Sequence, residues 1–191
     1  MAVRVVIAED EAIIRLDLRE TLEEQGYEVV GETGRGDEAV ALVKEHEPDI
    51  AILDIKMPGL DGLSAAREIT GERRAAVLIL TAFSQRDLVE RARDAGALAY
   101  LVKPFQRSEL IPAVEVAIGR FKEMRALEAE IRGLEDELAI RRVVDRAKGM
   151  LTDDHGMSEA NAFAFIQRQA MAERSTMKAT AQRVIDGQLS P

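Results

Sequence analysis

The sequence has no cysteine among its 191 residues, and it has no long apolar run. The absence of cysteine excludes disulfides, thiolate zinc sites and cysteine nucleophiles. No apolar stretch approaches the roughly 20 residues that span a bilayer, so no membrane partner is expected. The amino-terminal residues enter a strand-like run without a signal-peptide cleavage site, which together with the missing cysteines favours a cytoplasmic location.

Charge is distributed unevenly along the chain. The formal net charge of −9 argues against non-specific binding of nucleic acid by the whole molecule. Residues 1–121 contain 15 Lys and Arg against 23 Asp and Glu, whereas residues 141–183 contain 8 against 5. The two ends of the chain are therefore expected to have different electrostatic roles.

Strand and helix patterns alternate over the first 120 residues. Asp37 and Ser84 are the expected helix caps, and Gly26 and Gly96 are the expected helix stops. Near-continuous apolar strands predict an α/β fold, a flavodoxin-like (βα)5 doubly wound parallel sheet in the order 2-1-3-4-5. The predicted strands cover residues 4–8, 27–32, 49–54, 75–82 and 98–103, and the predicted helices cover 12–26, 37–48, 62–70 and 84–96.

A longer helix is predicted after this sheet, starting near Ser108. About two heptads of apolar residues are visible in it, fewer than the three or four that identify a coiled coil. A single amphipathic helix packed on its own domain is therefore the alternative to a coiled coil. The heptad positions are Met124, Leu127, Ile131, Leu134 and Leu138.

The last part of the sequence predicts a small three-helix module. Its helices are expected over residues 141–156, 157–174 and 175–187, with Ser158 and Ser175 as caps and Gly156 and Gly187 as breaks. Because a module of this size has little core alone, it is expected to gain stability from a neighbouring helix or subunit. The predicted domains are thus residues 1–119, a coiled-coil or linker helix at 120–140, and the helical module at 141–187.

Polar residues stand where the predicted strands end. Glu9 and Asp10 follow the first strand, Asp54 ends the third, Thr81 lies in the fourth and Lys103 ends the fifth. In an open parallel sheet, ligands bind outside the carboxyl ends of the strands. Each residue alone has an ordinary structural explanation, such as a turn or a helix-dipole partner. Their common position at the carboxyl edge of the sheet favours a ligand-binding site.

Three carboxylates held close together repel one another unless protons or a cation neutralise them. Oxygen ligands with one or two carboxylates suit Mg²⁺. The metal, with Lys103 on the other side, would stabilise phosphate oxygens at Asp54. Asp54 is then a nucleophile for phosphoryl transfer that forms an acyl phosphate.

Residues 3–120 resemble the receiver domain of two-component response regulators, through the stretches VVIAEDE, ILDIKMPGLDGL, LTA and YLVKPF. The resemblance implies that Asp54 accepts a phosphoryl group from a sensor histidine kinase. It implies a cis peptide bond before Pro104. It also implies Mg²⁺ bound by Glu9, Asp10, Asp54 and the Lys56 carbonyl, a switch pair of Thr81 and Tyr100, and Lys103 as the phosphate-binding lysine. The side chain of Lys56 is a mild departure, because it adds a positive charge beside the pocket.

Residues 125–186 resemble the ANTAR module, an RNA-binding three-helix unit found behind receiver domains. The likeness rests on AKGML, GMSEANAF and A-x-x-V-I at 181–185. It implies that the module, as a dimer, binds paired hairpins in a leader transcript and prevents termination. The candidate RNA-contacting residues are Arg142, Arg146, Ala147, Lys148, Gly149, Arg168, Lys178 and Arg183, and an ordinary solvated basic face is the alternative explanation for them.

Two phenylalanines of the module are expected on different sides of the same helix. Phe163 falls in line with Ile166 and Ala170, so it is expected in the core. Phe165 lies on another side of the helix, where it packs on a neighbouring helix or stacks on an RNA base.

The leading hypothesis from the sequence is an RNA-binding regulator that is switched by phosphorylation and acts in transcription antitermination. Phosphorylation is expected to promote a homodimer through residues 120–140. A DNA-binding helical output is the alternative, but helix 158–174 is long for a recognition helix. An enzyme is not expected, because only His46 and His155 are present and neither is near the pocket; at most, slow self-dephosphorylation follows.

Overall fold

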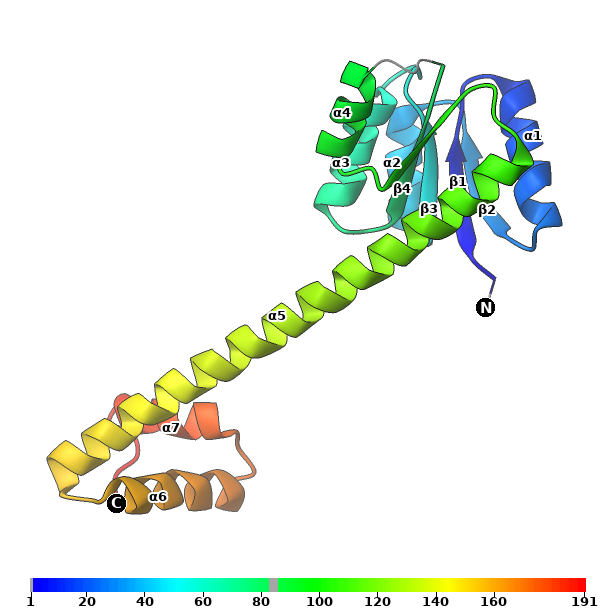
Figure 1. The fold of residues 1–191 in the computed structure, drawn as a ribbon. Coiled ribbons are helices and arrows are strands. Elements are labelled where there is room, and N and C mark those ends of the chain that lie inside the picture. Colours follow the sequence, from blue (N-terminus) through cyan, green and yellow to red (C-terminus); the bar gives the residue numbers. More distant parts are fainter. Residues whose placement is uncertain (1, 83–85) are drawn as a thin grey trace. The chain divides into compact units, whose positions relative to one another are not determined.

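The computed structural model describes residues 2–82 and 86–191. The strands are β1 (Arg4–Ala8), β2 (Glu28–Thr33), β3 (Ile50–Asp54), β4 (Ala76–Thr81) and β5 (Ala99–Val102). The helices are α1 (Ala12–Glu24), α2 (Gly36–His46), α3 (Gly62–Gly71), α4 (Arg86–Asp94), α5 (Arg107–His155), α6 (Glu159–Ala172) and α7 (Met177–Ile185) (Figure 1). The chain divides into two compact units, Met1–Arg125 and Ala126–Pro191.

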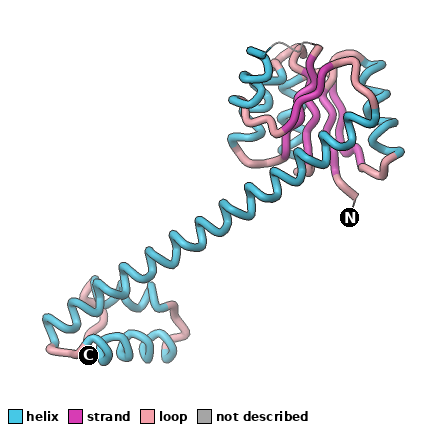
Figure 2. The backbone as a smooth tube through the Cα atoms, viewed as in Figure 1, coloured by secondary structure: helices cyan, strands magenta, loops and turns pink. Residues whose placement is uncertain are grey.

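The five strands of the first unit form one parallel sheet in the order β2-β1-β3-β4-β5, which confirms the predicted fold. Figure 2 shows the strands gathered in one sheet with helices around it. Alternate residues of each strand face opposite sides of the sheet. Ile50 and Ile52 of β3 pack with α1 and α5, whereas Ala51 and Leu53 pack with α2 and α3. Both faces of the sheet are therefore covered by helices, which explains why the strands read as continuous apolar runs.

The helix boundaries of the first unit follow the predicted stops better than the predicted caps. Gly26 and Gly96 adopt φ angles of +84° and +82° after α1 and α4. The predicted cap at Asp37 is wrong, because α2 begins at Gly36 with Arg35 as its N-cap. Asp37 lies in the first turn of α2 and pairs with Arg35 at 2.9 Å. The predicted cap at Ser84 lies outside the described residues.

Helix α5 is a single helix of 49 residues that contributes to both units. The sequence has no proline between Pro112 and Pro191, so no proline interrupts α5 after Pro112. The segment predicted as a separate helix at 141–156 is the end of α5, which stops before Gly156 at φ +63°. The domain boundaries after residues 119 and 140 stay predictions, since α5 runs through both.

The second unit packs α6 and α7 against the last turns of α5. Ser158 caps α6 by accepting a hydrogen bond from the Asn161 N–H at 3.3 Å, as predicted. Thr176 caps α7 instead of Ser175, accepting from the Ala179 N–H at 3.2 Å. The core of this unit consists of Val144, Ala147, Leu151, Ala162, Phe165, Ile166, Ala181 and Val184.

The prediction for the two phenylalanines of α6 is half wrong. Phe165 is 7% exposed and belongs to the core, whereas Phe163 is 44% exposed. The buried stripe of α6 runs through Ala162, Ile166 and Ala170 at four-residue spacing. Phe163 is turned about 100° from Ala162 around the helix axis, which carries its ring out of that stripe.

The long helix α5 is too polar to be a membrane span. Among the residues that the structure describes, no helix is both long and apolar enough to cross a bilayer.

Candidate functional site

The carboxyl edge of the sheet brings together acids that are far apart in sequence. Glu9 follows β1 and is fully buried, Asp10 is exposed beside it, and Asp54 at the end of β3 is 5% exposed. One carboxylate oxygen from each of these three residues lies within 4.8 Å of the other two. Burial of the strands on both sides thus fixes three negative charges at one point of the edge.

Both oxygens of Asp54 have partners within the chain. The backbone N–H of Lys56 donates to Asp54 Oδ2 at 3.1 Å. The Nζ of Lys103 lies 3.0 Å from Asp54 Oδ1 and 2.6 Å from Glu9 Oε2. Lys103 therefore joins the ends of β1 and β3, and the carboxylate of Asp54 is held in a defined orientation.

Burial and charge change the protonation of this cluster. Burial raises the pKa of Glu9, the negative charge of Asp54 adds to the rise, and the hydrogen bond with Lys103 opposes it. Burial acts to lower the pKa of Lys103, but its contacts with Glu9 and Asp54 outweigh that effect and raise it. Lys103 is therefore a cation at neutral pH.

The carboxylate cluster fits a hard divalent cation. Its three candidate ligand atoms are all oxygens, and one of the three residues is fully buried. Oxygen ligands of this kind suit Mg²⁺, which tolerates water in its remaining positions. The backbone of Lys56, the fourth expected ligand, lies directly after β3, and its N–H contacts Asp54.

The other residues expected at this site have different environments. Thr81, the last residue of β4, is 4% exposed, whereas Tyr100 on β5 is 47% exposed. In the β4–β5 ladder, Thr81 is opposite Val102 and Tyr100 is opposite Ile79. The peptide bond between Lys103 and Pro104 is cis.

A glycine that the sequence analysis did not single out shapes the loop after Asp54. The Gly62 N–H donates to the Ile55 carbonyl at 2.9 Å and closes this loop. A Cβ on Gly62 would lie 1.8 Å from the carbonyl oxygen of Asp54, a distance that no side chain can take. The Asp-Gly pair at the start of α3 was the available signal, since Asp61 also caps that helix.

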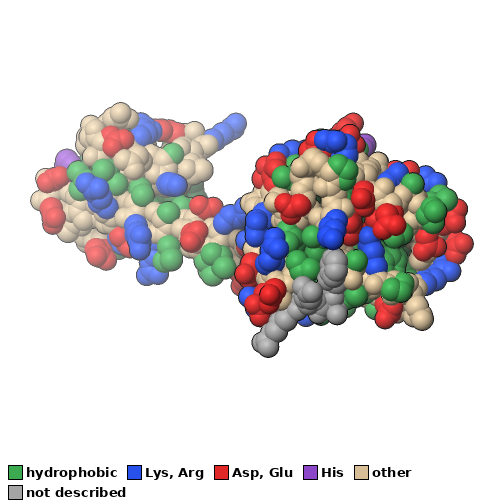
Figure 3. Space-filling view, turned by 90° about the horizontal axis from the view of Figure 1, so that it is seen from above, with side chains coloured by type: hydrophobic (Ala, Val, Ile, Leu, Met, Phe, Trp, Pro, Cys, Tyr) green, Lys and Arg blue, Asp and Glu red, His purple; other side chains and the backbone are tan. Residues whose placement is uncertain are grey.

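The candidate RNA-contacting residues all belong to the second unit, and most of them are exposed. Arg142, Arg146 and Gly149 are exposed on α5 at spacings of four and three residues, which places them on one side of the helix. Arg168 on α6 and Lys178 on α7 are also exposed. Figure 3 shows basic side chains dispersed among acidic and apolar ones on the visible face of this unit.

Three candidates of the same set are engaged within the chain. Ala147 is fully buried in the core, so its side chain contributes packing. Lys148 lies 3.0 Å from an oxygen of Asp145. Arg183 pairs with Glu173.

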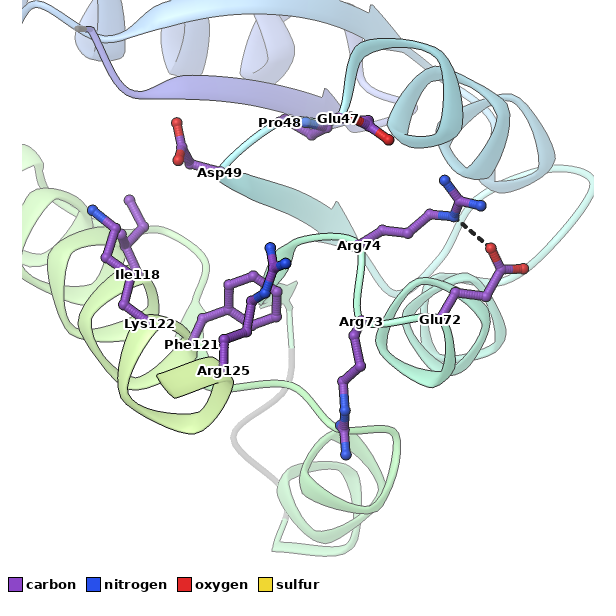
Figure 4. Close-up of a pocket in the computed structure, with 10 residues that line it drawn as sticks. All are labelled: Glu47, Pro48, Asp49, Glu72, Arg73, Arg74, Ile118, Phe121, Lys122 and Arg125. Carbon is purple, nitrogen blue, oxygen red and sulfur yellow. Dashed lines mark hydrogen bonds and ion pairs between the residues drawn. The ribbon is translucent and has the colours of Figure 1, made fainter. Parts of the chain in front are cut away.

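A separate cleft of about 500 Å³ lies in the first unit, at the amino-terminal ends of the strands (Figure 4). Asp49 precedes β3 and Arg74 precedes β4, so the cleft is at the sheet edge opposite Asp54. In this cleft Arg125 lies over the ring of Phe121, 5.9 Å from its centroid. None of the candidate site residues lines it.

Two family models match the chain. The response regulator receiver domain matches residues 5–115, and the ANTAR domain matches residues 132–185. The transcriptional regulatory protein PdtaR of Mycobacterium tuberculosis is 59% identical over 183 residues, which cover 96% of this chain and 89% of PdtaR.

Solved receiver domains superpose on the first unit. The signal receiver domain of NarL from M. tuberculosis is 33% identical with a TM-score of 0.60, covering 62% of this chain and 97% of that one. The receiver domain of sensor histidine kinase PA1611 from Pseudomonas aeruginosa is 31% identical with a TM-score of 0.56, covering 62% and 99%. Its structure has a magnesium ion coordinated in the active-site cleft.

Proposed function

The chain belongs to the response regulators, with a receiver domain followed by an ANTAR domain, and on this premise we propose that phosphorylation of Asp54 by a sensor histidine kinase controls RNA binding by the second unit. The observation that supports this most is the cluster at the sheet edge. There Lys103 contacts both Glu9 and Asp54, and Asp10 lies beside them. The cluster has a nucleophile, a cation and oxygen ligands for a metal.

The proposed reaction transfers a phosphoryl group between two side chains. An oxygen of Asp54 forms a bond to phosphorus as the bond from phosphorus to the kinase imidazole nitrogen breaks, and the imidazole keeps the electron pair and takes up a proton. The Lys56 N–H holds one carboxylate oxygen of Asp54, which orients the other. Lys103, 3.0 Å from Asp54 Oδ1, is placed to pair with phosphoryl oxygens.

Mg²⁺ is the proposed cofactor, held by Glu9, Asp10, Asp54 and the Lys56 carbonyl. When bound, it supplies positive charge that stabilises the phosphoryl oxygens and neutralises the carboxylates. Glu9 and Asp54 are the buried members of this set, and burial together with the negative charge of Asp54 raises the pKa of Glu9. The chain acts as a stoichiometric acceptor in this scheme and not as an enzyme with turnover.

The proposed output is antitermination through hairpins of a leader transcript. Phosphorylation replaces the single negative charge of the Asp54 carboxylate with a phosphoryl group that carries about −1.5 to −2 charges. Thr81 and Tyr100 are the proposed switch pair, in which Tyr100 leaves its exposed position when Thr81 turns to the phosphoryl group. PdtaR, a relative that aligns with 96% of the chain, is named a transcriptional regulatory protein, which supports a role in transcription.

Phosphotransfer and transcript selection test the proposal together. Incubation with labelled acetyl phosphate and Mg²⁺ should label the wild-type chain, and neither Asp54→Asn nor wild type with EDTA should be labelled. RNAs bound to the phosphorylated chain in a lysate of its host should be enriched in leader hairpins and depleted with Asp54→Asn. Labelling that survives in Asp54→Asn, or recovery of DNA in place of RNA, contradicts the proposal.

A further inference from the structure

A groove of about 460 Å³ lies within the second unit, where α5, α6 and α7 meet. Its apolar lining comes from all three helices: Ile140 and Val144 of α5, Phe163 of α6 and Met177 of α7. None of the proposed phosphotransfer residues belongs to it. Lys148 is the one candidate RNA-contacting residue in its lining.

The ring of Phe163 is the unexpected feature of this groove. Phe163 and Tyr100 are the two exposed aromatic residues among those that the structure describes, and Phe163 is the one in the second unit. Phe163 is not a member of the core cluster of the unit, whereas Phe165 and Ile166 of the same helix are. A phenylalanine that is 44% exposed in a groove has a ring face available to a ligand.

The charges around the groove have both signs. Asp145 lies 3.0 Å from Lys148 and 3.9 Å from Arg141, and Glu137 lines the groove as a second acid. The side chain of Arg141 is 81% exposed. Such carboxylates can accept from the N–H groups on the edge of a nucleobase, while the two cations can donate to its oxygens or to phosphate.

We propose that Phe163 is a stacking platform that receives one unpaired base from the loop of an RNA hairpin, with Arg141 and Lys148 pairing with the adjoining phosphates. The inference rests on the proposed RNA-binding function and assigns its recognition site. Loop bases are the part of RNA that proteins read by stacking on aromatic rings. Residues 141–183 carry 8 basic against 5 acidic residues in a chain of net charge −9, which favours a polyanion here.

The composition of the groove favours RNA over a second copy of the chain. The centres of protein interfaces are depleted of charged residues. Half of the groove lining is charged, namely Glu137, Arg141, Asp145 and Lys148. The exposed apolar residues suited to a second copy lie elsewhere on α5, at 127–138.

The test uses the full-length chain and hairpin RNAs with randomised loops. Hairpins are enriched on the wild-type chain, and the most enriched one is then made with 2-aminopurine at each loop position in turn. Phe163→Leu removes the aromatic face but keeps an apolar side chain, and Phe163→Tyr keeps the face. Met171→Ala is the matched control, because Met171 is 70% exposed on the same helix and does not line the groove.

Phe163→Leu is expected to weaken hairpin binding about ten- to a hundredfold, as the loss of one stacked base does. Quenching of 2-aminopurine at one loop position should disappear in Phe163→Leu and persist in Phe163→Tyr and Met171→Ala. A duplex of the stem alone should bind wild type and Phe163→Leu equally.

Four results would overturn the inference. If the wild-type chain enriches no hairpin, the proposed function fails and the inference fails with it. If hairpins bind Phe163→Leu as tightly as wild type, or if the quenching survives, the inference alone fails. If Phe163→Leu lowers the mass of the protein assembly in light scattering, the groove holds a second copy in place of RNA.

Discussion

At the residue scale, Lys103 provides the positive charge that allows two carboxylates to be buried together at the edge of the sheet. Its Nζ lies within 3.0 Å of an oxygen of both Glu9 and Asp54, and its side chain is 12% exposed. A buried charge that loses its partner is far more costly than an exposed one. The ion pair between Arg107 and Glu24, at 2.8 Å with both side chains exposed, provides a contrast within the same unit.

Lys103→Ala should lower the free energy of unfolding by about 3–5 kcal/mol, because it leaves buried carboxylates without their cation. Millimolar Mg²⁺ should restore part of this loss, since a ligand that binds only the folded state stabilises it. Thermal unfolding with and without Mg²⁺ measures both effects. Arg107→Ala is the control and should cost less than about 1 kcal/mol. A Mg²⁺-dependent shift that is no larger in Lys103→Ala than in wild type would contradict the shared role of lysine and metal.

Asp61 contributes to the same loop through a helix cap. Its Oδ1 accepts from the N–H groups of Leu63 and Ser64 at 3.0 and 3.1 Å, and its Oδ2 accepts from the Ser64 hydroxyl at 2.7 Å. The hydrogen bond from Ser64 lowers the pKa of Asp61, partial burial opposes this, and the two backbone N–H groups add to the lowering. The folded state therefore favours the ionised form.

Asp61→Ala should lower the free energy of unfolding by about 0.5–2 kcal/mol at neutral pH. Because the folded pKa is below the unfolded value of about 4, the stability that ionised Asp61 supplies is present above that value and is lost as the pH falls through the folded pKa. Urea unfolding between pH 3 and 7 should show the gap between wild type and Asp61→Ala closing in acid. Asp61→Asn keeps a neutral cap, so the difference in free energy of unfolding between Asp61→Asn and Asp61→Ala should not change with pH. Equal losses of stability in these two variants at neutral pH would contradict the capping role of Asp61.

Residue identities at the strand ends could be predicted from the sequence, but only some of the helix phases and caps could. The predicted edge residues Glu9, Asp54 and Lys103 lie together because apolar strands end where those polar residues begin. Several adjacent residues can cap a helix, and tertiary contacts choose among them: Thr176 rather than Ser175 accepts the capping hydrogen bond. The exposure of Phe163 could not be predicted, because α6 has two overlapping apolar stripes and the sequence does not show which of them is buried in the core.

At the element scale, α5 presents an apolar stripe without a partner inside its own unit. Leu127, Ile131, Leu134 and Leu138 are each 55–60% exposed. The heptad spacing was visible in the sequence. The sequence did not predict that the helix continues to His155. A continuing helix has no positive local signal, because it is marked only by the absence of proline and of a capping motif. A second copy of the chain is the expected partner of this stripe.

Leu134→Gln with Leu138→Gln tests this expectation. Both leucines are exposed, so the monomer should keep its stability to within about 0.5 kcal/mol. Wild type treated with beryllium fluoride and Mg²⁺ should double in mass in light scattering, whereas the double variant should stay monomeric. Glu130→Gln with Asp136→Asn, also exposed on α5, is the matched control and should dimerise. Dimers of the double variant as stable as those of wild type would exclude the stripe as the interface.

At the scale of the whole molecule, most of the net negative charge belongs to the first unit, and the second unit is close to neutral. The first unit, Met1–Arg125, contains 17 Lys and Arg against 24 Asp and Glu and includes the site that is proposed to bind a divalent cation. The second unit, Ala126–Pro191, contains 9 against 11, and its basic residues are concentrated within residues 141–183, at 8 against 5. A phosphoryl group on Asp54 would belong to the first unit, whereas the candidate RNA-contacting residues belong to the second. Its effect must pass through an equilibrium between states of the chain, typically worth about 1–3 kcal/mol.

The affinity of the full-length chain for an enriched hairpin RNA, measured with and without beryllium fluoride and Mg²⁺, tests this coupling most directly. Wild type should bind about 5- to 150-fold more tightly in the activated state, the range that such a coupling energy allows. Asp54→Asn should bind with one unchanged affinity in both conditions. Equal affinities of wild type in the two conditions would contradict a phosphorylation switch, even if the RNA binds tightly.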